Sequence, residues 1–485
     1  MLTARSSAPS VRTVNTVYHR VSEKPAATSL RAILVLACGA QFMVVLDGLI
    51  VTVALPEMRS GLSLSASGQQ WVINGYLVTC GGLLLLAARA ADLLGHRRMF
   101  LAGLAVFTLA SLAGGLAHDG SWLLTARVVQ GVGAAALAPG SLSLLTLTHT
   151  GEDRARALAV WSATSGSAGA LGLVLGGIIT DALGWRWVLL INVPVGIVLW
   201  IAATKLLPRD HPADRMALDL PGAISVTLGI SALVYGISQA DAGGWGSTRV
   251  VVALVLFGAL MLVFLGVERR SRNPLVPLAI FRRRNVVLAN VVMVLLGVIM
   301  TATLFFLSLY QQRVLGYSPL RTGLSLLPMS VVITLGAIAS KTLLPKLGPK
   351  RLLSGGALVM SAGLLLLATI PAHADYPAHV LAPTLVWAAG ASIVTMPCVA
   401  IATKGIDPGM AGLASGLVNT SRQIGGAVGL ASLSSIAGAA SAHSASPNAG
   451  DQLVHGYGVA LTVAAGVAFV VALIALQYRA NDASS

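Results

Sequence analysis

The stretch ILVLACGAQFMVVLDGLIVTVAL, from Ile33 to Leu55, contains a single charged residue, Asp47. A helix needs roughly twenty mainly apolar residues to cross about 30 Å of hydrocarbon, and this stretch is long enough. Thirteen further stretches of this kind follow, near 71–88, 99–117, 121–145, 157–180, 187–205, 222–239, 250–267, 286–309, 323–343, 352–371, 380–402, 411–436 and 456–477. Lipid offers no partner for backbone amides, so each span is predicted to be a helix. The sequence therefore predicts an all-α integral membrane protein with about fourteen transmembrane helices.

The composition supports a chain that is surrounded by lipid. Of the 485 residues, 56% are hydrophobic and only 10% are charged, whereas a soluble domain carries about 25% charged residues. The first apolar stretch is too long for a signal-peptide core and leads directly into further spans. The three cysteines lie inside apolar stretches at spacings that indicate neither a disulfide framework nor a metal site.

The positions of the basic residues explain the net charge of +15. With the N-terminus placed in the cytoplasm, 25 of the 32 lysines and arginines fall in cytoplasmic tails and loops, five in external loops and two within helices. This asymmetry is typical of membrane topology, in which cytoplasmic loops are enriched in cations. We therefore expect both termini to be cytoplasmic and no nucleic acid to be bound.

A weak internal repeat indicates two related halves. The loop LLGHRRMF (Leu93 to Phe100) is similar to KLGPKRLL (Lys346 to Leu353), and each precedes a span. Repeated bundles around a central site are common in transporters. The predicted organisation is a cytoplasmic tail, a six-helix bundle, an inserted helix pair, a second six-helix bundle and a short cytoplasmic tail, at 1–30, 31–207, 208–270, 271–478 and 479–485.

Asp47 is the one carboxylate that lies well inside a predicted span. A charge there is costly unless it has a partner, so an intramembrane acid is a functional candidate. Arg127, in the fourth span, lies at a similar depth: about 9 Å against about 13 Å from the outer surface, at 1.5 Å per residue. We interpret the two residues as a proton-coupling pair; the alternative is a static ion pair that joins two helices.

Further polar and small residues are candidates for the substrate cavity and for conformational change. The candidate cavity residues are Gln41, Asn74, Gln130, Gln311 and Asn419, for which hydrogen bonding between helices is the alternative. The candidate gating residues are Asp92, Gly95, Arg97 and Arg98 in the loop after the second span, and Gly172, Gly176 and Gly177 in the fifth. The loop cations could equally be a topology signal, and the glycines could serve helix packing alone.

Several segments together carry a recognisable set of motifs. They are Leu46-Asp47 followed by VALP (Val53 to Pro56), the loop with Asp92, Gly95, Arg97 and Arg98, the group Arg127, Gln130, Gly131 and Gly133, and the segments GALGLVLGG (Gly169 to Gly177), WRWVLLINVPVG (Trp185 to Gly196), SLYQQRVLGYSPLRTGLSLLP (Ser308 to Pro328) and GLVNTSRQIGGAVG (Gly416 to Gly429). In order and spacing they resemble the major facilitator superfamily, specifically its 14-helix drug:proton antiporter branch. Three positions depart from the pattern: Ala88, Leu93 and Leu173 stand where the family has glycine, a cation and proline.

The resemblance implies a major facilitator fold of two six-helix bundles plus two inserted helices. It also implies a proton-coupled antiporter that exports lipophilic drugs, antibiotics or related small molecules across the plasma membrane by alternating access. No acid lies within the last six spans, which argues against dications as preferred substrates. We expect a monomer in contact with membrane lipid, powered by the proton gradient, with no cofactor and no metal.

Two other functions remain open at this point, and a third is disfavoured. The same fold could serve a proton-coupled importer or facilitator, or a non-transporting sensor or lipid-handling protein. A membrane enzyme or an ATP-driven pump is disfavoured, because the chain contains neither a G-x-x-x-x-G-K-[ST] loop nor an H-E-x-x-H zinc motif.

Overall fold

The computed structural model describes residues 27–208, 210, 219–271, 274–404, 406 and 411–478, and every regular element in this part of the chain is helical. The α-helices are α1 (Ala27–Gly61), α2 (Ala66–Leu94), α3 (His96–Gly115), α4 (Gly120–Thr148), α5 (Gly151–Leu183), α6 (Arg186–Leu190), α7 (Asn192–Leu206), α8 (Leu220–Gly243), α9 (Thr248–Arg270), α10 (Arg284–Leu309), α11 (Pro319–Ser325), α12 (Leu327–Ala368), α13 (Ala382–Thr403), α14 (Ala411–Ala442) and α15 (Ala449–Leu476). A 3₁₀ helix, η2 (Leu278–Arg282), precedes α10. Two π-helical turns, η3 (Tyr310–Val314) and η4 (Tyr376–Leu381), follow α10 and precede α13.

Thirteen helical segments in the described residues are long and apolar enough to cross a membrane. One of them, Pro319–Ala368, has 50 residues and includes all of α12. Within α12 the backbone turns at Gly348, where φ is 74° and ψ is 161°, a conformation that glycine adopts without strain. Counting the two parts of α12 separately gives fourteen crossing segments. The predicted all-α membrane protein is therefore confirmed.

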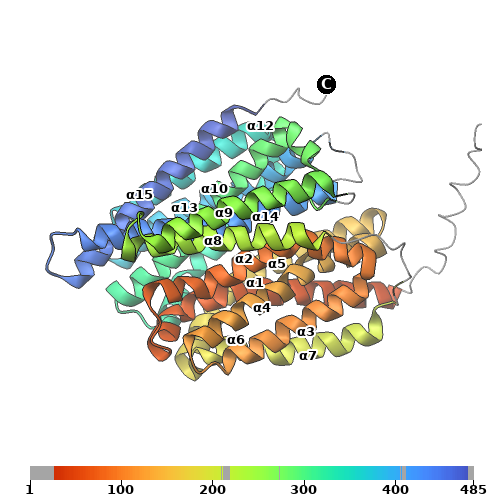
Figure 1. The fold of residues 1–485 in the computed structure, drawn as a ribbon, viewed down its shortest axis with the longest axis horizontal. Coiled ribbons are helices and arrows are strands. Elements are labelled where there is room, and N and C mark those ends of the chain that lie inside the picture. Colours follow the sequence, from red (N-terminus) through yellow and green to blue (C-terminus); the bar gives the residue numbers. More distant parts are fainter. Residues whose placement is uncertain are drawn as a thin grey trace, which may run out of the picture.

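The helices form two groups, and the helix pair α8 and α9 lies beside their boundary (Figure 1). Helices α1 to α7 pack mainly against one another, and so do α10 to α15. We call these groups the N-bundle and the C-bundle. They meet where α2 contacts α14 and where α5 contacts α11 and α12. Helix α8 contacts both α2 and α14, so it covers one of these two seams.

The surface of the helix pair is strongly apolar. In the most apolar part of α9 only 11% of the residues are buried, and Val255 and Leu262 expose 66% and 72% of their surface. A helix that presents large apolar side chains in nearly every direction is stable only when lipid surrounds it. The exposed apolar surface, like the composition, thus indicates that lipid surrounds the chain.

The predicted boundaries at residues 30, 207, 270 and 478 stay predictions. Most of the first tail, and the last tail, lie outside the described residues.

Candidate functional site

A buried ion pair lies in the interior of the N-bundle. Asp47 on α1 is 0% exposed and Arg127 on α4 is 1% exposed. The Arg127 Nη1 atom lies 2.7 Å from the Asp47 Oδ2 atom and 2.6 Å from the Gln130 Oε1 atom. The Gln130 Nε2 atom in turn donates to Asp47 Oδ1 at 2.8 Å. Arg127 and Gln130 are three residues apart on α4, so they share one helix face and approach the carboxylate together.

Two residues that the sequence analysis did not select complete the surroundings of Asp47. The Asn192 Nδ2 atom, at the start of α7, donates to Asp47 Oδ1 at 2.8 Å and to Ser111 Oγ on α3 at 3.0 Å. Ser111 donates its own proton to the Leu189 carbonyl at 2.9 Å. The signal for Asn192 in the sequence is its polar side chain inside the apolar run WRWVLLINVPVG. Four helices, α1, α3, α4 and α7, therefore contribute side chains to this cluster.

Arg127 is held in place by groups besides Asp47. Its Nε atom donates to the Val72 carbonyl on α2 at 3.1 Å, and its guanidinium lies 4.5 Å from the centre of the Tyr76 ring. Every hydrogen bond that reaches the Asp47 carboxylate from the described residues comes from an N–H donor. Donors on both oxygens stabilise an ionised carboxylate, and a buried charge of this kind requires such a set of partners. The geometry thus fits Asp47 without a proton.

A second set of contacts joins the two bundles near Pro56, at the end of the molecule that holds the α1–α2 connection. We call this end of the molecule the Pro56 end; the α2–α3 connection lies at the opposite end. Pro56 has no N–H, so the carbonyl of Thr52, four residues earlier on α1, lacks its helical partner. Ser308 Oγ on α10 donates to this carbonyl at 3.2 Å, and Gln312 Nε2 on η3 donates to the next one, that of Val53, at 3.0 Å.

These two hydrogen bonds, which we call the α1 latch, have a third neighbour. Arg313 Nη2 donates to Gln69 Oε1 on α2 at 3.0 Å. Gln312 and Arg313 both lie in the π-helical turn η3, a departure from α-helix geometry that is often found at functional sites. Side chains of the C-bundle thus bind backbone of the helix that carries Asp47, five residues beyond it.

The glycines of α5 bring this helix close to both bundles. A Cβ atom on Gly172 would lie 3.1 Å from the Leu46 carbonyl oxygen, and one on Gly176 would lie 2.9 Å from that of Ile50, so this face packs on α1 beside Asp47. A Cβ atom on Gly177 would lie 2.5 Å from the Pro319 carbonyl oxygen at the start of α11. Leu173, which replaces the family's proline, leaves α5 as one continuous helix. Helix α5 therefore connects α1 to the C-bundle.

The candidate gating residues of the α2–α3 loop are held by an acid that was not predicted. Asp210 accepts hydrogen bonds from the backbone N–H groups of Arg97 and Arg98, both at 2.9 Å, and so caps α3. The Arg97 side chain donates to the Thr204 carbonyl at 2.7 Å. Asp92 contacts a different residue: its Oδ1 atom lies 3.6 Å from the His96 Nε2 atom. Gly95 has a φ of 105°, and a Cβ atom there would collide with Asp210. In this structure the loop is thus tied to the segment that follows α7, within the N-terminal half of the chain.

The five candidate cavity residues occupy different surroundings. No hydrogen bond joins any two of them in the part of the chain that the structure describes. Gln130 belongs to the Asp47 cluster; Asn74 is fully buried and its amide has no partner there; and Gln311 accepts a hydrogen bond from Ser325. Gln41 is partly buried with an unpaired Oε1 atom, and Asn419 accepts from Arg422 at 3.0 Å. Their role in substrate binding stays a prediction.

These features together define a membrane transporter: two helical bundles, a buried ion pair inside one of them, and hydrogen bonds that close their interface at one end. The family model of the Major Facilitator Superfamily matches residues 37–430. The chain belongs to this superfamily, and it is a transporter rather than an enzyme.

Relatives and solved structures agree with this assignment. The chain is 42% identical to the cephamycin export protein CmcT of Amycolatopsis lactamdurans over 86% of this chain and 87% of that protein. It is 41% identical to the puromycin resistance protein pur8 of Streptomyces alboniger over 91% of this chain and 90% of that protein. A solved structure of a D-xylose-proton symporter aligns with a TM-score of 0.67 at 13% identity, covering 93% of this chain and 98% of that one. That likeness shows the major facilitator fold.

Proposed function

We propose that this transporter exports lipophilic drugs, antibiotics or related small molecules across the plasma membrane in exchange for protons. The names of the relatives, which refer to cephamycin export and to puromycin resistance, support the export of antibiotic-like compounds. The observation that carries the proton exchange is the Asp47 carboxylate, fully removed from water and surrounded by N–H donors. The charge balance of the site would change as soon as that carboxylate took up a proton.

The proposed coupling runs along α1. A proton on Asp47 removes the counter-ion of Arg127, which leaves the buried guanidinium uncompensated and favours a rearrangement of the cluster. The α1 latch lies five residues further along the same helix, about 7.5 Å at 1.5 Å per residue. On α5, Gly172 approaches α1 at Leu46 and Leu49, on either side of Asp47, and Gly176 approaches it at Ile50, between Asp47 and Thr52. Rearrangement around Asp47 can therefore alter the latch, so that proton binding and release are coupled to the opening and closing of the Pro56 end.

In this proposal the Pro56 end faces the outside and both termini are cytoplasmic, as the distribution of lysine and arginine favours. The latched structure is then the state that is closed to the outside, with Asp47 deprotonated. Each proton that moves inward down 100 mV supplies about 2.3 kcal/mol. Tenfold accumulation of a neutral substrate needs only about 1.4 kcal/mol, so one proton suffices.

Inside-out membrane vesicles with an imposed proton gradient test the proposal. Labelled puromycin, a cephamycin and a lipophilic monocation should accumulate in the vesicles, and a protonophore should abolish the uptake. Asp47→Asn should abolish it too, because the amide cannot exchange a proton. The matched control is Asp119→Asn at the exposed start of α4: this acid caps the helix by accepting from the Trp122 N–H at 2.9 Å, and asparagine caps equally well.

The outcomes separate export from its rivals. Undiminished, protonophore-sensitive uptake by Asp47→Asn would remove Asp47 from the coupling. Uptake only into right-side-out vesicles would identify an importer or facilitator. No proton-dependent flux across a broad panel, with the protein folded and inserted, would favour a sensor.

A further inference from the structure

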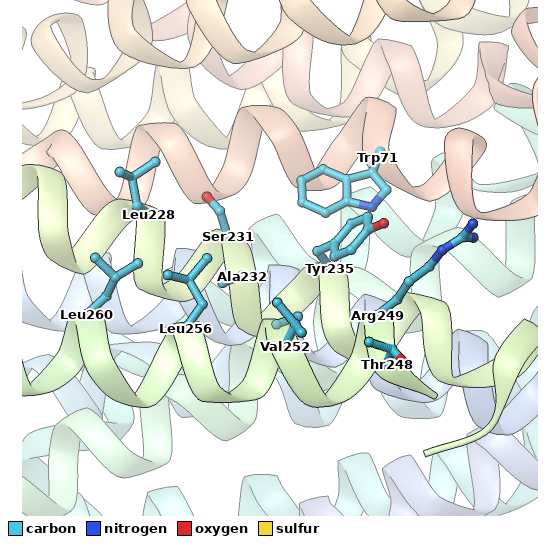
Figure 2. A pocket seen from close by; sticks show the side chains of 11 residues that line it. Trp71, Leu228, Ser231, Ala232, Tyr235, Thr248, Arg249, Val252, Leu256 and Leu260 are labelled. Carbon is cyan, nitrogen blue, oxygen red and sulfur yellow. The ribbon is translucent and has the colours of Figure 1, made fainter. Parts of the chain in front are cut away.

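A cavity of about 680 Å³ lies on the side of the molecule between α2, α8 and α9. This volume is within the range of about 300–1,000 Å³ that small-molecule sites occupy. Figure 2 shows that the lining divides into two regions. Trp71, Tyr235 and Arg249 gather at one end, and Leu228, Leu256 and Leu260 lie toward the other. The cavity is thus a mainly apolar groove with one polar end.

The length of the groove matches one leaflet of a bilayer. Arg249 and Leu260 both line it and lie eleven residues apart on α9, which corresponds to about 16 Å at 1.5 Å per residue. Half of a hydrocarbon core of about 30 Å is about 15 Å. Because α9 is long and apolar enough to cross the membrane and begins at Thr248, Arg249 lies at the membrane surface and Leu260 near the midplane.

The polar end has the chemistry of a lipid headgroup site. Arg249 is exposed, and it forms no hydrogen bond or ion pair with any residue that the structure describes. The rings of Trp71 and Tyr235 lie 6.5 Å apart beside it, and Trp71 Nε1 donates to Ser238 Oγ at 3.3 Å, which holds the indole in place. Tryptophan and tyrosine concentrate at membrane interfaces because one end of each ring system is apolar and the other is polar. None of the described residues that line the cavity is acidic.

We propose that this groove binds one phospholipid with a net negative headgroup. Its phosphate contacts the Arg249 guanidinium beside Trp71 and Tyr235, and an acyl chain lies along Leu228, Leu256 and Leu260. A cationic drug fits the groove less well, since Arg249 would repel it. The site follows a seam of the transporter, because α8 contacts both α2 and α14. The bound lipid would lie against Trp71 of the N-bundle and against the helix pair α8 and α9.

Native mass spectrometry of the purified full-length chain tests this site, with phosphatidylglycerol or phosphatidylcholine added at equal concentrations. We expect one phosphatidylglycerol to bind more tightly than any phosphatidylcholine. Arg249→Gln should weaken phosphatidylglycerol binding about fivefold, the usual effect of one arginine near an anionic headgroup, while leaving phosphatidylcholine unchanged. Arg321→Gln is the matched control: this residue is also exposed and lies on α11, where it stacks on Tyr317 at 3.8 Å, away from the groove.

A second variant tests the apolar part of the groove. Val252 lines the cavity and is 58% exposed, so Val252→Trp fills the space without entering the protein core. It should reduce binding of the tight phosphatidylglycerol by tenfold or more while the thermal unfolding temperature stays unchanged. Equal binding to the parent and both variants would overturn the proposal. The cation tetraphenylphosphonium provides a second test of the charge preference. If it displaced the lipid and bound equally tightly to the parent and to the Arg249→Gln variant, Arg249 would not select a negative headgroup, and the proposal would be overturned.

Discussion

The α1 latch allows a quantitative prediction about the equilibrium between the two states of the transporter. The double variant Ser308→Ala and Gln312→Leu removes both donors to the Thr52 and Val53 carbonyls. A hydrogen bond of this kind contributes about 1 kcal/mol net, so the pair contributes about 2 kcal/mol to the closed Pro56 end. That energy corresponds to a change of roughly 30-fold in the population ratio of the closed and open forms.

Double electron–electron resonance between spin labels on the two bundles measures this shift. Ser121 at the start of α4 and His443 just after α14 are exposed at the Pro56 end, and both can be replaced by cysteine. The three native cysteines are buried and should not compete for the label. The double variant should shift the distribution toward longer distances. Ser354→Ala is the control, because Ser354 is partly exposed and its hydroxyl donates to the Arg351 carbonyl of its own helix.

An unchanged distance distribution in the double variant would refute this reasoning. The latch would then be a consequence of bundle packing and not one of its causes. A shift of equal size in Ser354→Ala would also refute it, since that serine makes no contact between the bundles.

Three further predictions concern neighbouring parts of the structure. Gly177→Val should prevent closure of the Pro56 end, because its Cβ atom would lie 2.5 Å from the Pro319 carbonyl oxygen; the same spin labels should report a longer distance, and a parental distance would contradict this. Arg127→Leu leaves the Asp47 charge buried and unpaired, so it should destabilise the protein by about 3–5 kcal/mol, measured by thermal unfolding in detergent. Adding Asp47→Asn should restore much of the lost stability. If it does not, the unpaired Asp47 charge is not the cause of the destabilisation. Asp210→Ala removes the cap of α3 and should cost about 1 kcal/mol there, speeding hydrogen exchange at the Arg97 and Arg98 amides, whereas Asp92→Ala should leave both rates unchanged.

The sequence by itself determined the helices and their number. Each span follows from an apolar stretch of sufficient length, and lipid leaves the backbone no alternative to internal hydrogen bonding. Depth along a helix is also readable, since each residue adds a fixed 1.5 Å. The sequence therefore predicts similar depths for Asp47 and Arg127, and in the structure the Arg127 Nη1 atom lies 2.7 Å from the Asp47 Oδ2 atom. Their proton role stays a prediction.

Only the tertiary structure decided which helix faces meet. Asn192 lies 145 residues from Asp47 along the chain, and Ser308 lies 256 residues from Thr52. A polar side chain in an apolar run shows that a partner is needed, but its spacing carries no information on which distant helix supplies it. The α3 cap by Asp210 and the α1 latch depend on how separate helices are packed, and packing is set by all of their side chains at once. For this reason the helices could be read from local composition, whereas the contacts that couple the bundles could not.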